Sequence, residues 1–187
     1  GITQEIRLAS AQDQRLRWLV GLYYLDDDTR RRSRNTATSF LPGGAGSTRD
    51  ILDGDNEYFQ LGVSKNYAVF GEAGFDITND LTFTVGGRYT IDKKYWEIEA
   101  REYSLGPDGF DNQFSTAPLQ GPFLVITDQK WSEFTPKATL DWRFGDGKLA
   151  YASVAKGFKG GGWQGGAANA IAAETPYAPE TAWTYEI

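Results

Sequence analysis

The feature that most constrains this chain is a stretch of alternation that runs far beyond the usual length of a strand. From Tyr67 to Ala100 the sequence reads YAVFGEAGFDITNDLTFTVGGRYTIDKKYWEIEA, with apolar and polar residues in turn on both sides of a short Thr-Asn-Asp connection. Successive side chains of a strand point to opposite faces, so each run has one apolar face and one polar face. The stretch predicts a long antiparallel hairpin.

The same period of two recurs along the chain and predicts seven strands. Their expected ranges are Ile2–Ala9, Arg15–Asp27, Asn66–Ile77, Leu81–Tyr103, Gln129–Phe144, Lys148–Lys159 and Glu180–Ile187. Short connectors with Asn, Asp and Gly alternate with long ones rich in Gly, Pro, Ser and Asp, which are Asp28–Lys65, Gly106–Asp128 and Gly160–Pro179. This order places all short turns at one end of an up-and-down sheet and all long loops at the other.

The two faces of the predicted strands differ in composition. One face carries almost no charge and ends in aromatic residues, whereas the other carries both signs of charge among Thr and Gly. The charged row consists of Arg7, Arg17, Glu72, Asp76, Arg88, Asp92, Glu133, Lys137, Asp141 and Arg143. A lipid-facing apolar band with aromatic girdles and a wet lumen has this pattern. We therefore predict an all-β fold, an antiparallel up-and-down transmembrane β-barrel, with about seven strands of a larger barrel present here.

Strand length supports the barrel over its main competitor, a soluble β-sandwich whose apolar face packs on a second sheet. A tilted strand needs only roughly 9–11 residues to cross a bilayer. The run Leu81–Tyr103 is about twice that length, so its outer part is expected to stand above the membrane and lead into an extracellular loop. The predicted topology puts Ala11–Gln14, Thr78–Asp80 and Gly145–Gly147 in the periplasm. It puts Arg30–Asn56, Gly106–Thr127 and Gly160–Pro179 outside.

Composition narrows the possible chemistry. The 187 residues include no Cys and no His, which removes thiolate metal sites, Cys nucleophiles, and the commonest general base and zinc ligand. The formal net charge of −6 argues against a nucleic-acid partner. No run approaches 18 consecutive apolar residues, so no transmembrane helix is expected. We find no case for an enzyme and expect no metal or cofactor. The chain reads as an internal piece of a longer protein.

Several segments in their order along the chain resemble the barrel of TonB-dependent outer-membrane receptors. They are QEIRLAS, RWLVGLYYLDDD, YAVFGEAGFDITNDLTFTVGGRYTIDKKYWE, YASVAKGFKGGGW and PYAPETAWTYEI. In that family a 22-stranded barrel is filled by an N-terminal plug, and an energised inner-membrane complex pulls on the plug to admit scarce nutrients. The resemblance implies that residues 1–187 are part of one such barrel domain, without the plug or the segment that contacts TonB.

The resemblance also implies partners and a location. The charged row would face the plug, and the remaining barrel strands would complete the wall. Outer-membrane lipid and lipopolysaccharide would surround the barrel, TonB would act through the plug, and a siderophore-iron, vitamin or oligosaccharide ligand would bind outside. The expected location is the outer membrane of a Gram-negative bacterium. A passive porin, in which the same charges line an open pore, remains an alternative, as does a soluble carbohydrate-binding β-sandwich.

Candidate ligand contacts lie in the long connectors. The run DDDTRRRSR supplies Arg30, Arg31, Arg32 and Arg34, which suit lipopolysaccharide phosphates or an anionic ligand, although a solvated charge run is the simpler interpretation. The aromatic candidates are Phe110, Phe114, Trp163 and Tyr177, for which local loop packing is an equal alternative.

Two weaker motifs lie in the same connectors. GGGWQG fits a dinucleotide fingerprint but lacks the context of a parallel sheet, so a flexible outer loop is the favoured interpretation. DGDNE offers oxygens suited to calcium without the rest of an EF-hand loop, so a polar loop tip is favoured there.

Overall fold

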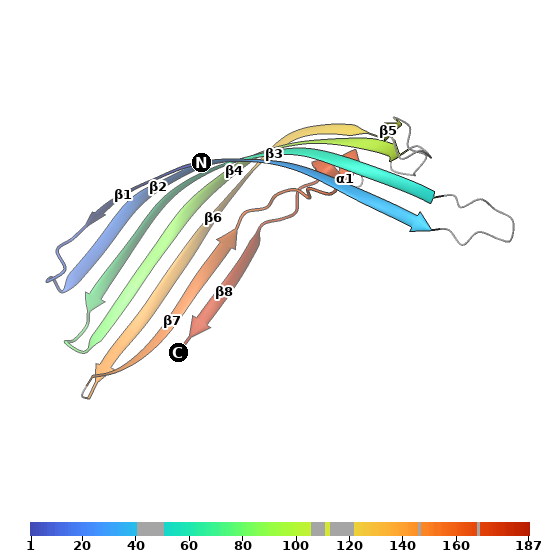
Figure 1. Cartoon of the computed structure of the whole chain (residues 1–187). Helices are drawn as coiled ribbons and strands as arrows, with labels where there is room; N and C mark the ends of the chain where they lie inside the picture. The colour runs from blue at the N-terminus through green and yellow to red at the C-terminus, as the bar shows by residue number, and fades with distance from the viewer. Residues whose placement is uncertain (41–50, 106–110, 113–121, 146, 168) are drawn as a thin grey trace.

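The computed structural model describes every residue except 41–50, 106–110, 113–121, 146 and 168, and it forms one curved antiparallel sheet (Figure 1). Seven strands follow the order β1-β2-β3-β4-β6-β7-β8, and the two-residue β5 pairs with β4. The strands are β1 Ile2–Ala9, β2 Leu16–Phe40, β3 Ile51–Asp76, β4 Leu81–Leu105, β5 Asp111–Asn112, β6 Phe123–Phe144, β7 Lys148–Lys159 and β8 Glu180–Glu186. Within the described residues the only helix is α1, Ala170–Glu174.

The up-and-down topology predicted from the sequence is confirmed. Each long strand pairs with the next one along the chain, and the three connections at one end are short turns. At the β6–β7 turn, Gly145 and Gly147 have φ angles of 55° and 79°, a left-handed conformation that glycine adopts without steric cost. At the β3–β4 turn the Thr78 hydroxyl accepts hydrogen bonds from the backbone amides of Asp80 and Leu81.

The sheet extends much farther than the sequence predicts, and the expected loop Asp28–Lys65 is wrong over most of its length. Residues Asp28–Phe40 pair one to one with Ile51–Val63 in the β2–β3 ladder, and Ser64 and Lys65 pair with Asp27 and Asp26. Their high charge is typical of a loop, but side chains of opposite charge can pair across neighbouring strands of a ladder. Arg32, for example, donates to the carboxylate of Glu57 across the ladder.

The other two predicted loops also contain structure. β6 begins at Phe123, so the last part of the expected loop Gly106–Asp128 is a strand paired with β4. The expected loop Gly160–Pro179 contains the single turn α1, capped by Asn169, whose side chain accepts a hydrogen bond from the amide of Ala172. A bridge between Gly162 and Tyr177 closes this segment at its base.

The core of the molecule is small and lies on one side of the sheet. Its buried members are Tyr58, Ile98, Ala100, Val125, Ala167 and Ala173. In Figure 1, α1 lies under the outer part of the long strands, short of their ends, and it contacts β6. Over the rest of the sheet no second layer covers either face among the described residues. Among the described residues, no helix is long and apolar enough to cross a membrane.

Candidate functional site

The concave, charged face of the sheet is the first candidate site, since all ten predicted residues of the charged row lie on it. The register aligns Arg17 with Gly74, Phe70 with Arg88, and Thr82 with Asp141 across neighbouring strands. Positions two residues apart share a face, so the row continues along every strand from β1 to β6. The polar face predicted from alternation is thus continuous. We call it the inner face.

Ion pairs on the inner face join different strands, either adjacent ones or two that flank a third. The Lys137 ammonium lies 2.8 Å from the Glu72 carboxylate across β4, and the Lys156 ammonium lies 2.6 Å from Glu133. All four side chains are partly or largely exposed, so each pair contributes little to stability by itself. They fix the register of the strands and leave a wall in which both signs of charge face the interior.

At the turn end of the inner face, Arg17 makes a two-pronged contact with Asp76. Its two terminal nitrogens donate to the two carboxylate oxygens at 2.5 and 2.6 Å, and the Thr82 hydroxyl donates to the same carboxylate at 2.8 Å. Arg15 donates to the backbone oxygens of Asp76 and Ile77. These contacts hold the β1–β2 and β3–β4 turns together.

A polar hollow of about 260 Å³ opens on the inner face between β4 and β7. Arg88, Asp92 and Lys156 contribute charged groups to its lining. The Arg88 guanidinium lies 4.7 Å from the centre of the Tyr23 ring, a cation–π contact that orients it along the wall. The hollow offers both donors and acceptors to a polar surface packed against it.

At the far end, residues 160–167 and 169–174 fold back against the inner face instead of extending away from it. Trp163 stacks parallel to Trp96 with ring centres 6.4 Å apart and meets Trp131 edge-on at 5.8 Å. Its indole nitrogen donates to the carbonyl of Glu174 at 3.0 Å. Lys94 donates to the carbonyl of Gly161 at 2.7 Å, and Gln60 donates to that of Gly165. We call this folded segment the inner strap.

The apolar contacts of the inner strap form the buried core. Ala173 and Ala167 are at most 1% exposed and pack with Ile98, which is fully buried. The Tyr58 hydroxyl donates to the carbonyl of Ala167 at 3.4 Å. The strap is therefore fastened to β3, β4 and β6 by both burial and hydrogen bonds.

The structure separates the predicted ligand contacts. Arg30 and Arg32 align with Leu61 and Phe59 on the convex face, whereas Arg31 aligns with Gln60 on the inner face. Arg34 lies on β2, and Phe110 and Phe114 lie outside the described residues. Trp163 is half-buried between two other tryptophans, and Tyr177 remains 50% exposed at the base of the strap.

Sequence reasoning missed the residues that receive the inner strap. Tyr58, Gln60, Trp96 and Trp131 form its platform, and Tyr58 and Gln60 fall inside an expected loop. The signal that could have found them is the alternation in YWEIEA. There the apolar residues Trp96, Ile98 and Ala100 stand at even-numbered positions, which are mostly polar nearer the start of the same strand.

The weak motifs receive no support as sites. GGGWQG follows β7, but the neighbouring strands are antiparallel, so the parallel-sheet setting of a dinucleotide site is absent among the described residues. Asp53–Glu57 lies within the β3 ladder rather than at a loop tip. In the described part of the chain no group of three or more acidic residues is arranged to hold a metal ion.

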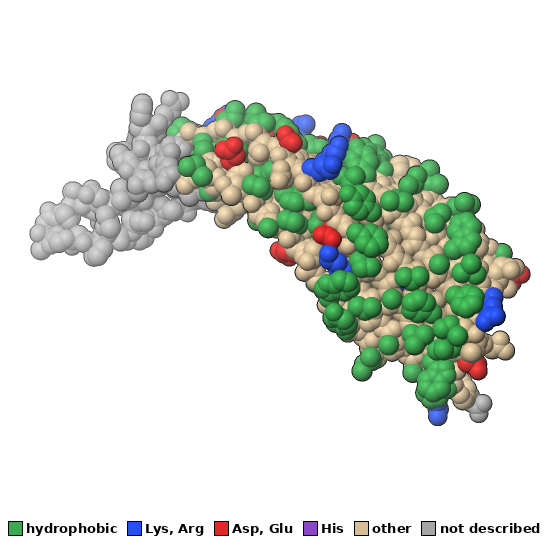
Figure 2. All heavy atoms as spheres, turned by 180° about the vertical axis from the view of Figure 1, so that it is seen from behind, with side chains coloured by type: hydrophobic (Ala, Val, Ile, Leu, Met, Phe, Trp, Pro, Cys, Tyr) green, Lys and Arg blue, Asp and Glu red, His purple; other side chains and the backbone are tan. Residues whose placement is uncertain are grey.

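The convex face carries a band of exposed apolar side chains. Leu22, Val69, Val85 and Phe134 are each about half exposed, and the rings of Trp142 and Phe144 pack against each other at a tilt beside the β6–β7 turn. Figure 2 shows one face of the molecule with hydrophobic side chains spread across it and few charges among them. An apolar sheet face this large is unusual in water and needs a covering of lipid or protein.

Comparisons with known proteins agree with this arrangement. Residues 4–187 match the family described as TonB dependent receptor-like, beta-barrel. The fold is also similar to the crystal structure of the ferric yersiniabactin uptake receptor FyuA from Yersinia pestis, with a TM-score of 0.70 and 16% sequence identity. That similarity covers 98% of this chain and 24% of FyuA, so the chain spans about a quarter of the protein it resembles.

These findings confirm the fold and the resemblance predicted from the sequence. Seven antiparallel strands in one open sheet match part of a receptor barrel, and the family is one of outer-membrane transporters and receptors rather than enzymes. The family implies a plug domain and an interaction with TonB in general terms. The chain belongs to the TonB-dependent receptor β-barrel family.

Proposed function

We propose that this chain is part of the wall of an outer-membrane receptor that takes up a scarce nutrient with energy transmitted by TonB. The observation that carries the proposal is the opposition of the two faces in one sheet of this family. The convex face is apolar and exposed, as lipid contact requires, and the inner face is a continuous wall of paired charges.

The inner face suits a plug better than an open pore in this proposal. Its ion pairs and polar hollow offer closely spaced donors and acceptors to a folded domain, and the row from Arg7 to Arg143 is the surface we assign to that contact. The turn end, with Arg17 and Asp76, would face the periplasm. The inner strap would stand at the outer mouth.

For the nutrient we propose the siderophore-iron class, with vitamins and oligosaccharides as the other classes. The support is the similarity in fold to a receptor described as taking up ferric yersiniabactin. Tyr177, exposed at the base of the strap, and Arg31, on the inner face, are the described side chains that we propose as ligand contacts at the mouth.

We assign the remaining arginine candidates differently. Arg30 and Arg32 point to the convex face, so we propose contact with lipopolysaccharide for them.

Uptake by the full-length receptor tests the proposal. The receptor is expressed in a Gram-negative strain that lacks its own siderophore receptors, and uptake of labelled ferric siderophores, vitamin B12 and oligosaccharides is measured with and without a functional TonB. We expect accumulation of one ferric siderophore that depends on TonB. Uptake that persists unchanged without TonB would favour the passive channel instead. A receptor that remains in the soluble fraction of the cell would contradict the membrane proposal altogether.

A further inference from the structure

Three lysines stand side by side on the convex face. The ladders align Lys65 of β3 with Lys93 of β4, and Lys93 with Lys130 of β6. All three side chains are exposed. Neighbouring strands lie about 4.8 Å apart, and like charges directly opposite each other destabilise a sheet. Such a row is a cost to the fold unless an anion neutralises it. We call these residues the lysine row.

Within the described residues, an ion pair neutralises only one end of the lysine row. Lys65 lies 3.4 Å from the Asp26 carboxylate, whereas the ammonium of Lys93 rests 5.8 Å from the centre of the Tyr67 ring. Lys130 makes no ion pair or hydrogen bond within the described part of the chain. Asp28 and Asp128 face the same side one step farther out, but neither pairs with these lysines. The charge at Lys93 and Lys130 is therefore available to an external group.

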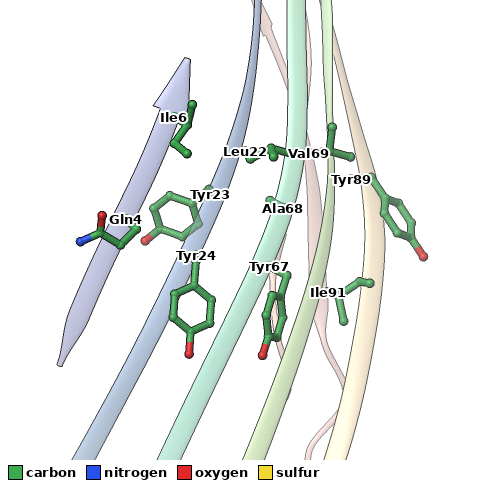
Figure 3. A pocket seen from close by; sticks show the side chains of 10 residues that line it. All are labelled: Gln4, Ile6, Leu22, Tyr23, Tyr24, Tyr67, Ala68, Val69, Tyr89 and Ile91. Carbon is green, nitrogen blue, oxygen red and sulfur yellow. The ribbon is translucent and has the colours of Figure 1, made fainter. Parts of the chain in front are cut away.

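An apolar groove of about 450 Å³ lies directly beside the lysine row (Figure 3). Tyr24, Tyr67 and Ile91 form the register step next to Asp26, Lys65 and Lys93, toward the short turns. The groove is lined by Gln4, Ile6, Leu22, Tyr23, Tyr24, Tyr67, Ala68, Val69, Tyr89 and Ile91. These residues come from β1, β2, β3 and β4, and Figure 3 shows their side chains along the groove. Its lining is almost wholly apolar, and several of these side chains are about half exposed.

We propose that the lysine row and this groove together bind one phosphate-bearing glycolipid of the outer leaflet, the lipid of lipopolysaccharide. The ammonium groups hold the phosphate as compact point charges, and the groove holds an acyl chain. The order of the two parts matches a lipid in the outer leaflet, because the apolar groove lies toward the short-turn end and the cations lie toward the long strand extensions. The inference rests on the membrane placement proposed above.

The test measures lipid retained by the full-length receptor purified in detergent. The probes are bisphosphorylated lipid A and the same lipid after enzymatic removal of its phosphates, and bound lipid is counted by native mass spectrometry. The triple variant Lys65→Gln, Lys93→Gln, Lys130→Gln is expected to retain lipid A roughly tenfold less well, because each cation near an anionic surface favours binding. Lys148→Gln is the matched control, since Lys148 is an exposed lysine on the same face beside the β6–β7 turn.

A second variant tests the groove independently of the charges. Val69→Trp fills the groove and leaves the lysine row intact, so it is expected to weaken retention of both forms of the lipid. Heat-modifiable migration on gels verifies that each variant is folded. The proposal is overturned if the triple variant retains lipid A as the parent does, or if removal of the phosphates changes nothing. Displacement of lipid A by millimolar inorganic phosphate would assign the row to a free anion and overturn it too.

These results stay distinguishable from those of the uptake test. If the triple variant loses lipid retention, its TonB-dependent uptake can still be measured separately. Failure of uptake by the parent receptor would not alter lipid retention.

Discussion

Along β4, the half nearer the short turns and the half beyond the lysine row place their apolar residues on opposite faces. In β4, Val85 and Tyr89 are exposed on the convex face of the near half, while Arg88 points inward. In the far half of the same strand, Ile98 is buried on the inner face, and Glu97 and Glu99 stand on the convex face. The face of β4 that carries the apolar side chains therefore changes within Lys93–Tyr95.

The switch teaches that alternation alone does not identify the buried face. In the near half the apolar face has no protein covering among the described residues, which is the condition of a surface that contacts lipid. In the far half the apolar face is covered by the inner strap, as in an ordinary water-soluble core. What covers a face of the sheet, rather than the period of two in the sequence, determines which residue types occur on that face.

The largest expected effect comes from removing the centre of the covered half. Ile98→Ala deletes a fully buried side chain and is expected to cost about 3 kcal/mol, from lost burial and the cavity that remains. Urea unfolding of the full-length receptor in lipid measures the loss, and hydrogen exchange locates it at residues 160–174. Val85→Ala is the control in the uncovered half. Equal effects of the two changes would erase the distinction between the halves.

A charge placed on the convex face tests where the uncovered half ends. Val85→Arg lies midway along the apolar band and is expected to cost about 2 kcal/mol, because the guanidinium would face hydrocarbon. Ile126→Arg, on the same face beyond the lysine row, is expected to cost less than about 1 kcal/mol. Folding into vesicles at increasing urea compares the two. A larger cost at Ile126 would place the membrane boundary elsewhere.

Releasing the inner strap is expected to have a smaller and more local effect. Trp163→Ala removes two aromatic contacts, each worth about 0.5–1.5 kcal/mol beyond burial. Exchange of the strap amides should rise while the β3–β4 ladder near the short turns stays protected. Tyr177→Ala, which removes a half-exposed ring, should leave strap protection nearly unchanged. Loss of protection throughout the sheet would mean that the strap is part of one cooperative unit with it.

The last prediction concerns orientation, and its substitutions are expected to change stability least. The parent chain has no Cys, so single substitutions are unique labels. A membrane-impermeant maleimide applied to intact cells should modify Gln164→Cys in the strap and spare Asn79→Cys in the β3–β4 turn until the outer membrane is permeabilised. Both sites are exposed in the structure. The opposite labelling pattern would mean that the short turns face outward and the inner strap faces the periplasm.

The near half is the part that sequence reasoning predicted well. Continuous alternation in Leu81–Ile91 fixes strand, face and register there, because a shift by one residue would reverse both faces. The far half was predicted poorly for two physical reasons. Charges on both faces, as in Asp28–Arg34, resemble a loop when no neighbour is known. The inner strap depends on contacts between Trp96, Trp131 and Trp163, which are distant in sequence.

The paired length of β2 and β3 bears on which large molecules would contact this protein first. Their ladder runs without interruption from Leu16 with Phe75 to Phe40 with Ile51. At about 3.4 Å per residue, the 25 residues of β2 span about 85 Å, well over twice the thickness of a bilayer's hydrocarbon core. In the orientation proposed above, an antibody or a phage tail would reach the outer part of this hairpin before a nutrient-sized pocket. On that proposal, antibodies and phages would select on its sequence separately from ligand choice.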